Sequence, residues 1–241
     1  QVVFDTTCSD KEDIFMKTDM KISGSGKIGQ GEYNLIKISG SGAIEGPVNF
    51  ETFKVSGSCK VCPDAALEGN EMHISGSIHS QSEIKANTLH VSGSLHSERD
   101  MKVRSLKVSG SCRLQGKIYA DEIYVSGSLK SSEEVNADIV EIRGMATLND
   151  LFGEQITFIP ESSGTFHFFR FAKHRKLSNV KNIECTTLEA GCLQCDTISA
   201  ENILLTDGCV VNHIQCDGTL SYDSTCQIGT VEGNCAQKLL S

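Results

Sequence analysis

The stretch that decides the fold is Leu106-Lys-Val-Ser-Gly-Ser-Cys112, because close copies of it recur along the first half of the chain. An eighth, degenerate copy of its Ser-Gly-Ser centre reads Arg143-Gly-Met145. The other central glycines are Gly24, Gly40, Gly57, Gly76, Gly93, Gly110 and Gly127. Successive glycines are separated by 16, 17, 19, 17, 17, 17 and 17 residues. A repeat of this kind indicates a solenoid with one turn of the chain per repeat.

Apolar residues keep fixed places around each glycine. The positions four and two residues before it are apolar in every copy, and the position between them is polar. This alternation is typical of a strand with one buried face. A second face follows the glycine, and pairs such as Met101 and Val103 supply a third. The sequence therefore predicts an all-β fold, a parallel β-helix of triangular windings of about 17 residues each.

The second half lacks Ser-Gly-Ser but keeps the alternation. Buried pairs begin at Ile183, Leu188, Leu193, Ile198, Ile203, Cys209, Ile214, Leu220, Cys226 and Val231. From Ile203 their steps are 6, 5, 6, 6 and 5, so three faces again sum to one winding. We expect a lead-in or cap at 1–18, a first block at 19–148, an irregular aromatic-rich connector at 149–182 and a second block at 183–241.

The corner at each Ser-Gly-Ser follows a β-branched residue. Glycine accepts positive φ without a clash of Cβ, so we expect this conformation at the corner glycines. Stacked serines are expected to hydrogen-bond between windings.

These repeats resemble a known family. The Lys-Ile-Ser-Gly-Ser-Gly and Lys-Val-Ser-Gly-Ser blocks, and Cys226-Gln-Ile-Gly-Thr-Val-Glu232, are similar to the bactofilins, the polymer-forming cytoskeletal proteins of bacteria. The resemblance covers about residues 20–148 and 183–236. It implies a right-handed β-helix without enzymatic activity or catalytic residues, which polymerises by end-to-end contact of its terminal windings. The chain departs from a single compact bactofilin domain in having two blocks.

Two outward columns flank the corner, three residues before and three residues after each glycine. Their basic members are Lys21, Lys37, Lys54, His73, His90 and Lys107 before it, and Lys27, Lys60, His79, His96, Arg113 and Lys130 after it. We call them the basic columns. They form either a solvated face or a stripe for an anionic partner, such as acidic lipid, a cell-wall polymer or the acidic face of another filament. The net charge of −9 argues against nucleic acid as the partner.

Residues 149–182 hold six of the ten phenylalanines. This segment either packs its aromatic side chains on the flank of the helix or forms an interface with a partner or a second copy. The candidate interface residues are Phe166, Phe168, Phe169, Arg170 and Phe171.

The 11 cysteines include two Cys-x-x-Cys pairs, Cys59 with Cys62 and Cys192 with Cys195. This spacing is typical of zinc sites, but the pairs lie 133 residues apart. Most cysteines also fall on inward positions, so we interpret them as small core residues in a reducing compartment. The inward set is Cys59, Cys112, Cys185, Cys195, Cys209, Cys216 and Cys226. We expect no metal and no cofactor.

Windings this short leave almost no loop length to build a catalytic cleft, which disfavours the polysaccharide-cleaving β-helix enzymes. We therefore expect a non-enzymatic, polymer-forming scaffold. The alternative is a monomeric or dimeric binding module for an anionic partner. No apolar run approaches the roughly 20 residues needed to cross a bilayer, and Gln1–Lys17 do not resemble a signal peptide. We expect a cytoplasmic protein, with association at a membrane surface as an open alternative.

Overall fold

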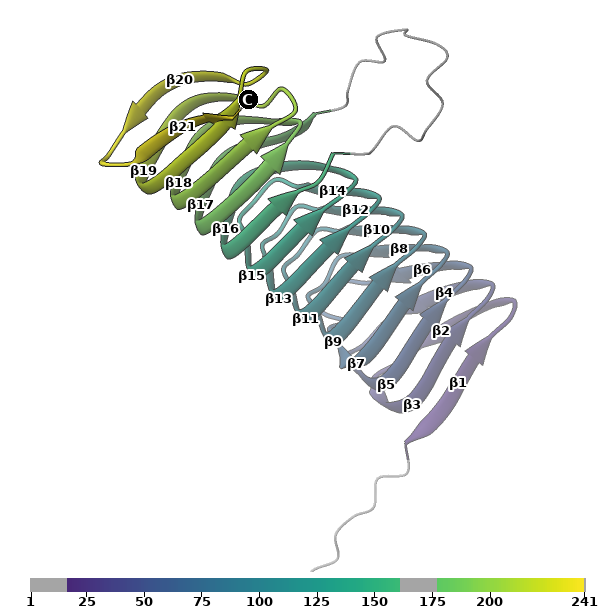
Figure 1. Cartoon of the computed structure of the whole chain (residues 1–241). Helices are drawn as coiled ribbons and strands as arrows, with labels where there is room; N and C mark the ends of the chain where they lie inside the picture. Colours follow the sequence, from purple (N-terminus) through teal and green to yellow (C-terminus); the bar gives the residue numbers. More distant parts are fainter. Residues whose placement is uncertain (1–16, 161–176, 241) are drawn as a thin grey trace, which may run out of the picture.

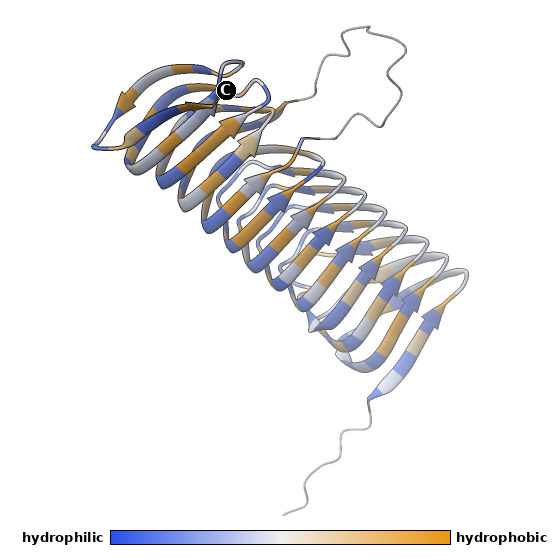
Figure 2. Ribbon diagram, viewed as in Figure 1, coloured by the Kyte–Doolittle hydropathy of each residue, from blue (hydrophilic) through white to orange (hydrophobic). Residues whose placement is uncertain are grey.

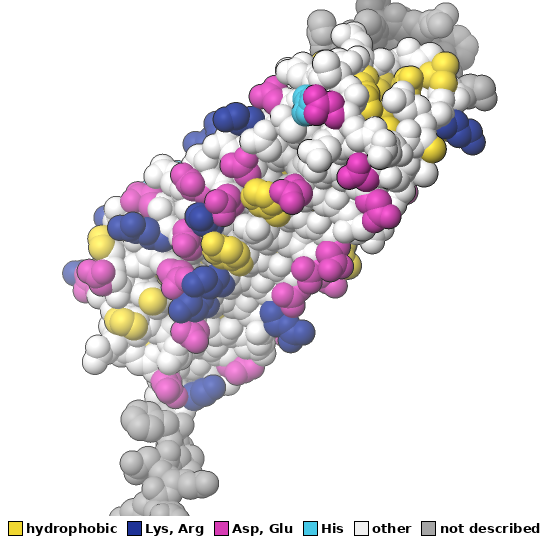
Figure 3. All heavy atoms as spheres, turned by 90° about the vertical axis from the view of Figure 1, so that its left-hand side faces the viewer, with side chains coloured by type: hydrophobic (Ala, Val, Ile, Leu, Met, Phe, Trp, Pro, Cys, Tyr) yellow, Lys and Arg dark blue, Asp and Glu magenta, His cyan; other side chains and the backbone are white. Residues whose placement is uncertain are grey.

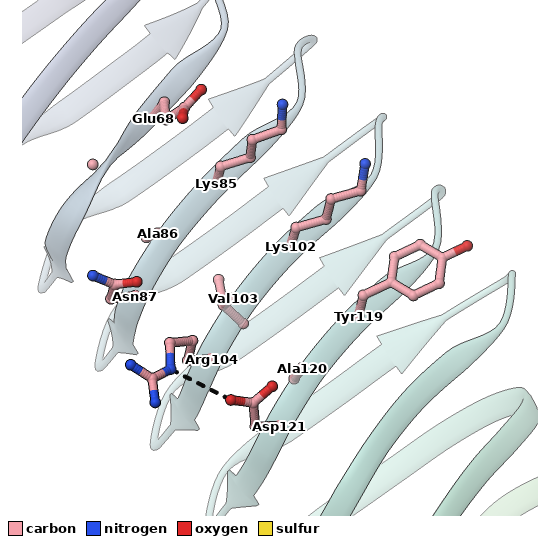
Figure 4. A pocket seen from close by; sticks show the side chains of 11 residues that line it. Glu68, Lys85, Ala86, Asn87, Lys102, Val103, Arg104, Tyr119, Ala120 and Asp121 are labelled. Atoms are coloured by element: carbon pink, nitrogen blue, oxygen red, sulfur yellow. Dashed lines mark hydrogen bonds and ion pairs between the residues drawn. The ribbon is translucent and has the colours of Figure 1, made fainter.

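Strand pairing in the computed structural model is parallel throughout and joins residues one winding apart. The structure describes residues 17–160 and 177–240, which contain strands and no helix. These strands coil into a rod of about 12 windings (Figure 1). The coil is right-handed, as the direction of the strands relative to the axis shows in Figures 1 and 4. The fold predicted from the repeat is confirmed.

Each winding of the first part contains one long and one short strand. The long strands are β3 (Gly31–Ile38), β5 (Val48–Val55), β7 (Leu67–Ile74), β9 (Ile84–Val91), β11 (Met101–Val108), β13 (Ile118–Val125) and β15 (Val135–Ile142), preceded by β1 (Thr18–Ile22). The short strands are β2 (Ser25–Ile28), β4 (Ser41–Ile44), β6 (Ser58–Val61), β8 (Ser77–Ser80), β10 (Ser94–Ser97), β12 (Ser111–Leu114) and β14 (Ser128–Ser131).

The later windings contain longer strands, because no Ser-Gly-Ser corner interrupts them. They are β16 (Met145–Phe158), β17 (Ser178–Gly191), β18 (Leu193–Thr206) and β19 (Val210–Asp223). The C-terminal winding consists of β20 (Gln227–Glu232) and β21 (Ala236–Leu240).

Three buried pairs per winding make the cross-section triangular. In β5, Val48 and Phe50 are buried, and Phe53 and Val55 are buried after a bend in the strand. The short strands supply the third pair. Register places Val55 between Ile38 and Ile74, all at most 1% exposed. Figure 2 shows the resulting alternation of apolar and polar residues along the strands. Equivalent side chains therefore stack into columns along the axis.

The expectation about the corner glycines is wrong. Among the described glycines, only Gly208 and Gly233 have positive φ. At the corner the chain instead passes so close to the previous winding that a Cβ on Gly93 would overlap the carbonyl oxygen of Gly76. Close approach of two backbones therefore requires glycine there. Of the predicted serine bonds between corners, the described residues contain one, from Ser77 Oγ to Ser58 Oγ at 3.4 Å.

The predicted connector at 149–182 is also wrong over much of its length. Strand β16 continues regularly to Phe158 and pairs with β15 on one side and β17 on the other. Leu151, for example, lies between Val135 and Ile183. Residues 149–158 and 178–182 therefore belong to regular windings, and the two expected blocks form one stack. The remaining connector, 161–176, lies outside the described residues. At the other end, β1 begins one residue before the expected block.

The close approach at the corners can be tested by adding one methyl group. We expect Gly93→Ala to lower the free energy of unfolding by about 3 kcal/mol, because the new Cβ forces two windings apart. Gly24→Ala is the matched control, since a Cβ at the same repeat position in the first winding meets nothing within 4 Å. It should change stability by about 1 kcal/mol or less. Urea denaturation of both variants measures the difference, and equal effects would contradict this account.

Candidate functional site

Strand pairing aligns the residues of the basic columns one above another along the rod, as the repeat predicts. Strand pairing puts His73 between Lys54 and His90. It also puts His79 and His96 next to each other, followed by Arg113. The two columns run on either side of the Ser-Gly-Ser corner, one on the long strands and the other on the short strands.

Acidic side chains neutralise part of these columns. Lys27 Nζ lies 2.7 Å from Glu45, and Lys21 Nζ lies 3.9 Å from Asp19. Two of the histidines also lie beside glutamates. Within the described part of the chain, no ion pair forms at Lys37, Lys54, Lys60, Lys107, Arg113 and Lys130. The columns therefore keep six cations that form no ion pair.

The histidines form two ring pairs within these columns. The ring centroids of His73 and His90 are 5.2 Å apart, and those of His79 and His96 are 4.9 Å apart and nearly parallel. The pKa of His90 is lowered by burial and by the nearby charges of His73 and Lys107. His90 therefore takes up a proton only at a lower pH than an ordinary histidine, and Lys and Arg carry most of the positive charge at neutral pH.

Charge reversal tests whether the columns bind an anionic partner. We expect Lys54, Lys107, Arg113 and Lys130, all changed to Glu, to abolish salt-sensitive binding to vesicles that contain acidic lipid or to an anionic cell-wall polymer. Cosedimentation at two salt concentrations measures this.

The matched control reverses four cations on a different face. These are Lys85, Lys102, Arg104 and Lys117, each of which forms an ion pair with an acid. This control changes net charge equally and should retain binding. Equal loss in both variants would mean that overall charge, and not the columns, controls binding.

A shallow groove of about 440 Å³ runs along the face that carries Lys85, Lys102 and Arg104, over β7, β9, β11 and β13 (Figure 4). Lys85 and Lys102 on its rim both contact Glu83, and Arg104 contacts Asp121 at 3.4 Å. Lys102 also lowers the pKa of Glu83. The cations and acids around the groove are therefore largely neutralised.

The carboxylates that line the groove are far apart. Glu68 and Asp121 belong to β7 and β13, three windings apart. At about 4.8 Å per winding, their backbones are separated by about 14 Å. Glycosidases hold two carboxyl groups about 5 to 9.5 Å apart. This groove does not offer such a pair.

The described cysteines are free thiols, and most of them fill the core as predicted. Cys59, Cys112, Cys195, Cys209 and Cys216 are buried, whereas Cys185 and Cys226 are half-buried. Burial raises the pKa of several thiols to about 12, Cys59 and Cys112 among them. A raised pKa leaves the thiol protonated, which is unfavourable for a metal ligand at neutral pH.

These thiols make stability depend on alkaline pH. An unfolded cysteine loses its proton near pH 8.5, whereas the pKa of folded Cys112 is about 12. The folded state therefore holds more protons than the unfolded state above about pH 8.5, so the contribution of this thiol to stability is complete well below that pH and is lost as the pH rises towards about 12. The slope is about 1.4 kcal/mol per pH unit for each such thiol.

We expect Cys112→Ala to reduce the loss of unfolding free energy at alkaline pH by about 1.4 kcal/mol per pH unit, because it removes one such thiol. Leu95→Ala, which truncates the residue stacked on Cys112, should lower stability without changing the slope. Free energies of unfolding at pH 7.5, 9 and 10 measure both. An unchanged slope in Cys112→Ala would contradict the burial of this thiol.

Other predicted residues fall elsewhere. The candidate interface residues Phe166, Phe168, Phe169, Arg170 and Phe171 lie outside the described residues. Of the connector's other phenylalanines, Phe158 is buried in the core.

One cluster was missed from the sequence. The side chains of His79, His96 and Glu98 gather on the outer surface of β8 and β10. The signal was a His-x-Glu sequence one winding after another histidine, which becomes visible only when the windings are aligned.

In the described part of the chain, the C-terminal winding is covered by another winding on one side only. Strands β20 and β21 pair with β19 on one side and have no second partner strand in the described part of the chain. Ile228 and Val231 are half-buried, whereas Val211 and Ile214, one winding earlier in the same columns, are at most 1% exposed. Leu239 on β21 is 62% exposed. Figure 3 faces this end and shows apolar side chains gathered there, while charges of both signs mix along the flank.

In comparisons with known proteins, no family model, no curated protein and no solved structure matches the chain. The described residues also contain no helix of the length and apolarity that crossing a bilayer requires. The resemblance to bactofilins stays a prediction. Function has to be argued from the surfaces and ends of the rod.

Proposed function

We propose that this protein is a non-enzymatic scaffold that polymerises through end-to-end contact of its β-helix. The open C-terminal winding carries the proposal. Its two strands present unpaired backbone groups on one side, and such groups are a template for pairing with another strand. Its inward side chains, Ile228 and Val231, are half-buried, because no further described winding covers them as later windings cover the interior of the stack.

A second copy of this chain is the partner that fits. The exposed edge bends around a triangular outline with the pitch of the repeat, so a flat strand cannot cover it. The first winding of another copy has the same outline and pairs with β3 and β4 on one side only among the described strands. A contact between unlike ends does not close on itself and produces a filament.

The composition of the ends supports the same reading. No proline interrupts β20 or β21, and each carries one charged residue, Glu232 and Lys238. Proteins that stay monomeric usually protect an open edge with charges, proline or a covering segment. The reduced thiols favour the cytoplasm as the compartment of this scaffold.

A charge at the end tests the proposal. We expect filaments of the parent protein in electron microscopy above a critical concentration, and Leu239→Glu to raise that concentration at least about 100-fold, because a buried unpaired carboxylate costs several kcal/mol. Ile139→Glu is the matched control, since Ile139 is an exposed apolar residue on the flank. It should polymerise like the parent. A parent protein that sediments as one small particle at every concentration would overturn the proposal.

A binding module for an anionic partner is the second candidate. The six cations of the basic columns that form no ion pair favour it. In that case the parent protein remains monomeric or dimeric yet binds acidic vesicles or wall polymer, and the charge-reversed columns lose this binding. Both activities can coexist, because the columns lie on the flank and the polymer contacts lie at the ends.

A further inference from the structure

Three metal-ligating side chains meet on the flank of the rod. His79 on β8 and His96 on β10 are register partners in adjacent windings. Glu98 follows β10 and lies two residues after His96, on the same outward side. One ligand atom from each residue lies within 4.8 Å of the others, and His79 Nε2 is 3.0 Å from Glu98 Oε1.

We propose that His79, His96 and Glu98 bind one divalent transition-metal ion of the zinc type. Two imidazole nitrogens and one carboxylate oxygen are a ligand set that Zn²⁺, Co²⁺ and Ni²⁺ accept. Three protein ligands leave a fourth position open to water or to a group on another molecule. The site lies on the flank, so it is independent of assembly through the ends.

The backbone around this cluster is fixed before any ion arrives. Strands β8 and β10 pair over all four residues, which holds the Cα atoms of the two histidines one winding apart. The rings are stacked with an interplanar angle of 13°. Small rotations of these half-exposed side chains can bring the ring nitrogens to about 2.1 Å from a shared ion.

A neighbouring amide orients the carboxylate. Gln81 Nε2 donates a hydrogen bond to Glu98 Oε2 at 3.4 Å, which leaves Glu98 Oε1 directed at His79. Such contacts from outside the ligand set position ligands in metal sites. Glu98 also supplies the negative charge that a cation needs beside two neutral rings.

Positively charged side chains in the same column oppose the binding of a metal cation. Lys60 precedes His79 and Arg113 follows His96, each one winding away. Two cations about 4.8 Å along the columns weaken the binding of a third. The proposed site therefore occupies the two windings where histidine replaces lysine and arginine in this column, and removing a flanking charge should tighten binding.

The other histidine pair is an internal control. His73 and His90 also lie side by side in adjacent windings, with their rings tilted by 42°, and Glu71 lies 3.6 Å from His73. Yet only the cluster at His79 brings three ligand atoms together among the described residues. Two neighbouring histidines alone therefore do not make the site, and the position of the carboxylate and the angle between the rings distinguish the two pairs.

Titration with zinc chloride and with cobalt chloride on the whole chain tests the proposal. We expect one Zn²⁺ per chain, and His79→Ala, His96→Ala and Glu98→Gln each to weaken binding at least about 10-fold. His73→Ala and His90→Ala should change the dissociation constant less than about 3-fold. Arg113→Gln should tighten it, because it removes a positive charge beside the ion.

Two spectra identify which side chains bind the ion. Bound Co²⁺ should show the visible bands of nitrogen and oxygen ligands without a thiolate charge-transfer band, since half-exposed cysteines are the competing ligands. In proton NMR of the parent protein, added Zn²⁺ should shift the ring signals of His79 and His96 and leave those of His73. Thiolate bands, unshifted His79 and His96 rings, or unchanged affinity in Glu98→Gln would overturn the proposal.

Discussion

Stacking of each winding on the one before it, with equivalent residues in vertical register, is the constraint on which the rest of the structure depends. Parallel pairing fixes this register, and the apolar columns make a shifted register unfavourable, because a slip by one residue would expose the core face. The corner glycines allow the backbones to approach closely enough for pairing to continue around the corner. Every outward feature of the rod inherits the same order: a residue type that repeats in sequence becomes a column in space.

Much of the fold could be predicted because its signal is repetitive. Sixteen apolar positions before eight glycines determine one of the three faces, and the spacing determines which residues stack. The sequence did not predict the end of the first block correctly, because the loss of Ser-Gly-Ser does not end the regular windings. In β16 the alternation of Leu148, Leu151 and Ile156 continues without that marker. The sequence predicts the position of each corner glycine correctly but not the physical reason for it. A sequence shows that a Cβ is excluded there, but not which atoms exclude it.

The surfaces were predictable only in part. Columns follow from register alone, so the stacking of Lys54, His73 and His90 could be expected. Ion pairs depend on which rotamer a long side chain adopts and on acids in neighbouring columns. The neutralisation of Lys27 by Glu45 and the approach of Glu98 to His79 therefore required coordinates. The open end was equally hidden, because the sequence of the last winding resembles that of the windings inside the stack.

A rod of this kind has two sorts of surface with different uses. The flank repeats its chemistry at each winding and suits extended, charged partners, with a local exception where two histidines and a glutamate meet. The ends expose backbone and core and suit another copy of the same rod. Both depend on one continuous stack that runs through β15, β16 and β17, on either side of the 161–176 segment.

Distances between spin labels along one column test that continuity most directly. Lys37, Lys107 and Glu189 lie in the same column, and four windings separate each successive pair. With labels on non-natural side chains, which leave the native thiols untouched, the Lys107–Glu189 pair should give one narrow distance distribution in pulsed electron paramagnetic resonance. The Lys37–Glu189 distance should be longer by about 19 Å, four times the strand spacing of about 4.8 Å. A broad distribution for Lys107–Glu189, or a difference far from this value, would contradict the single stack.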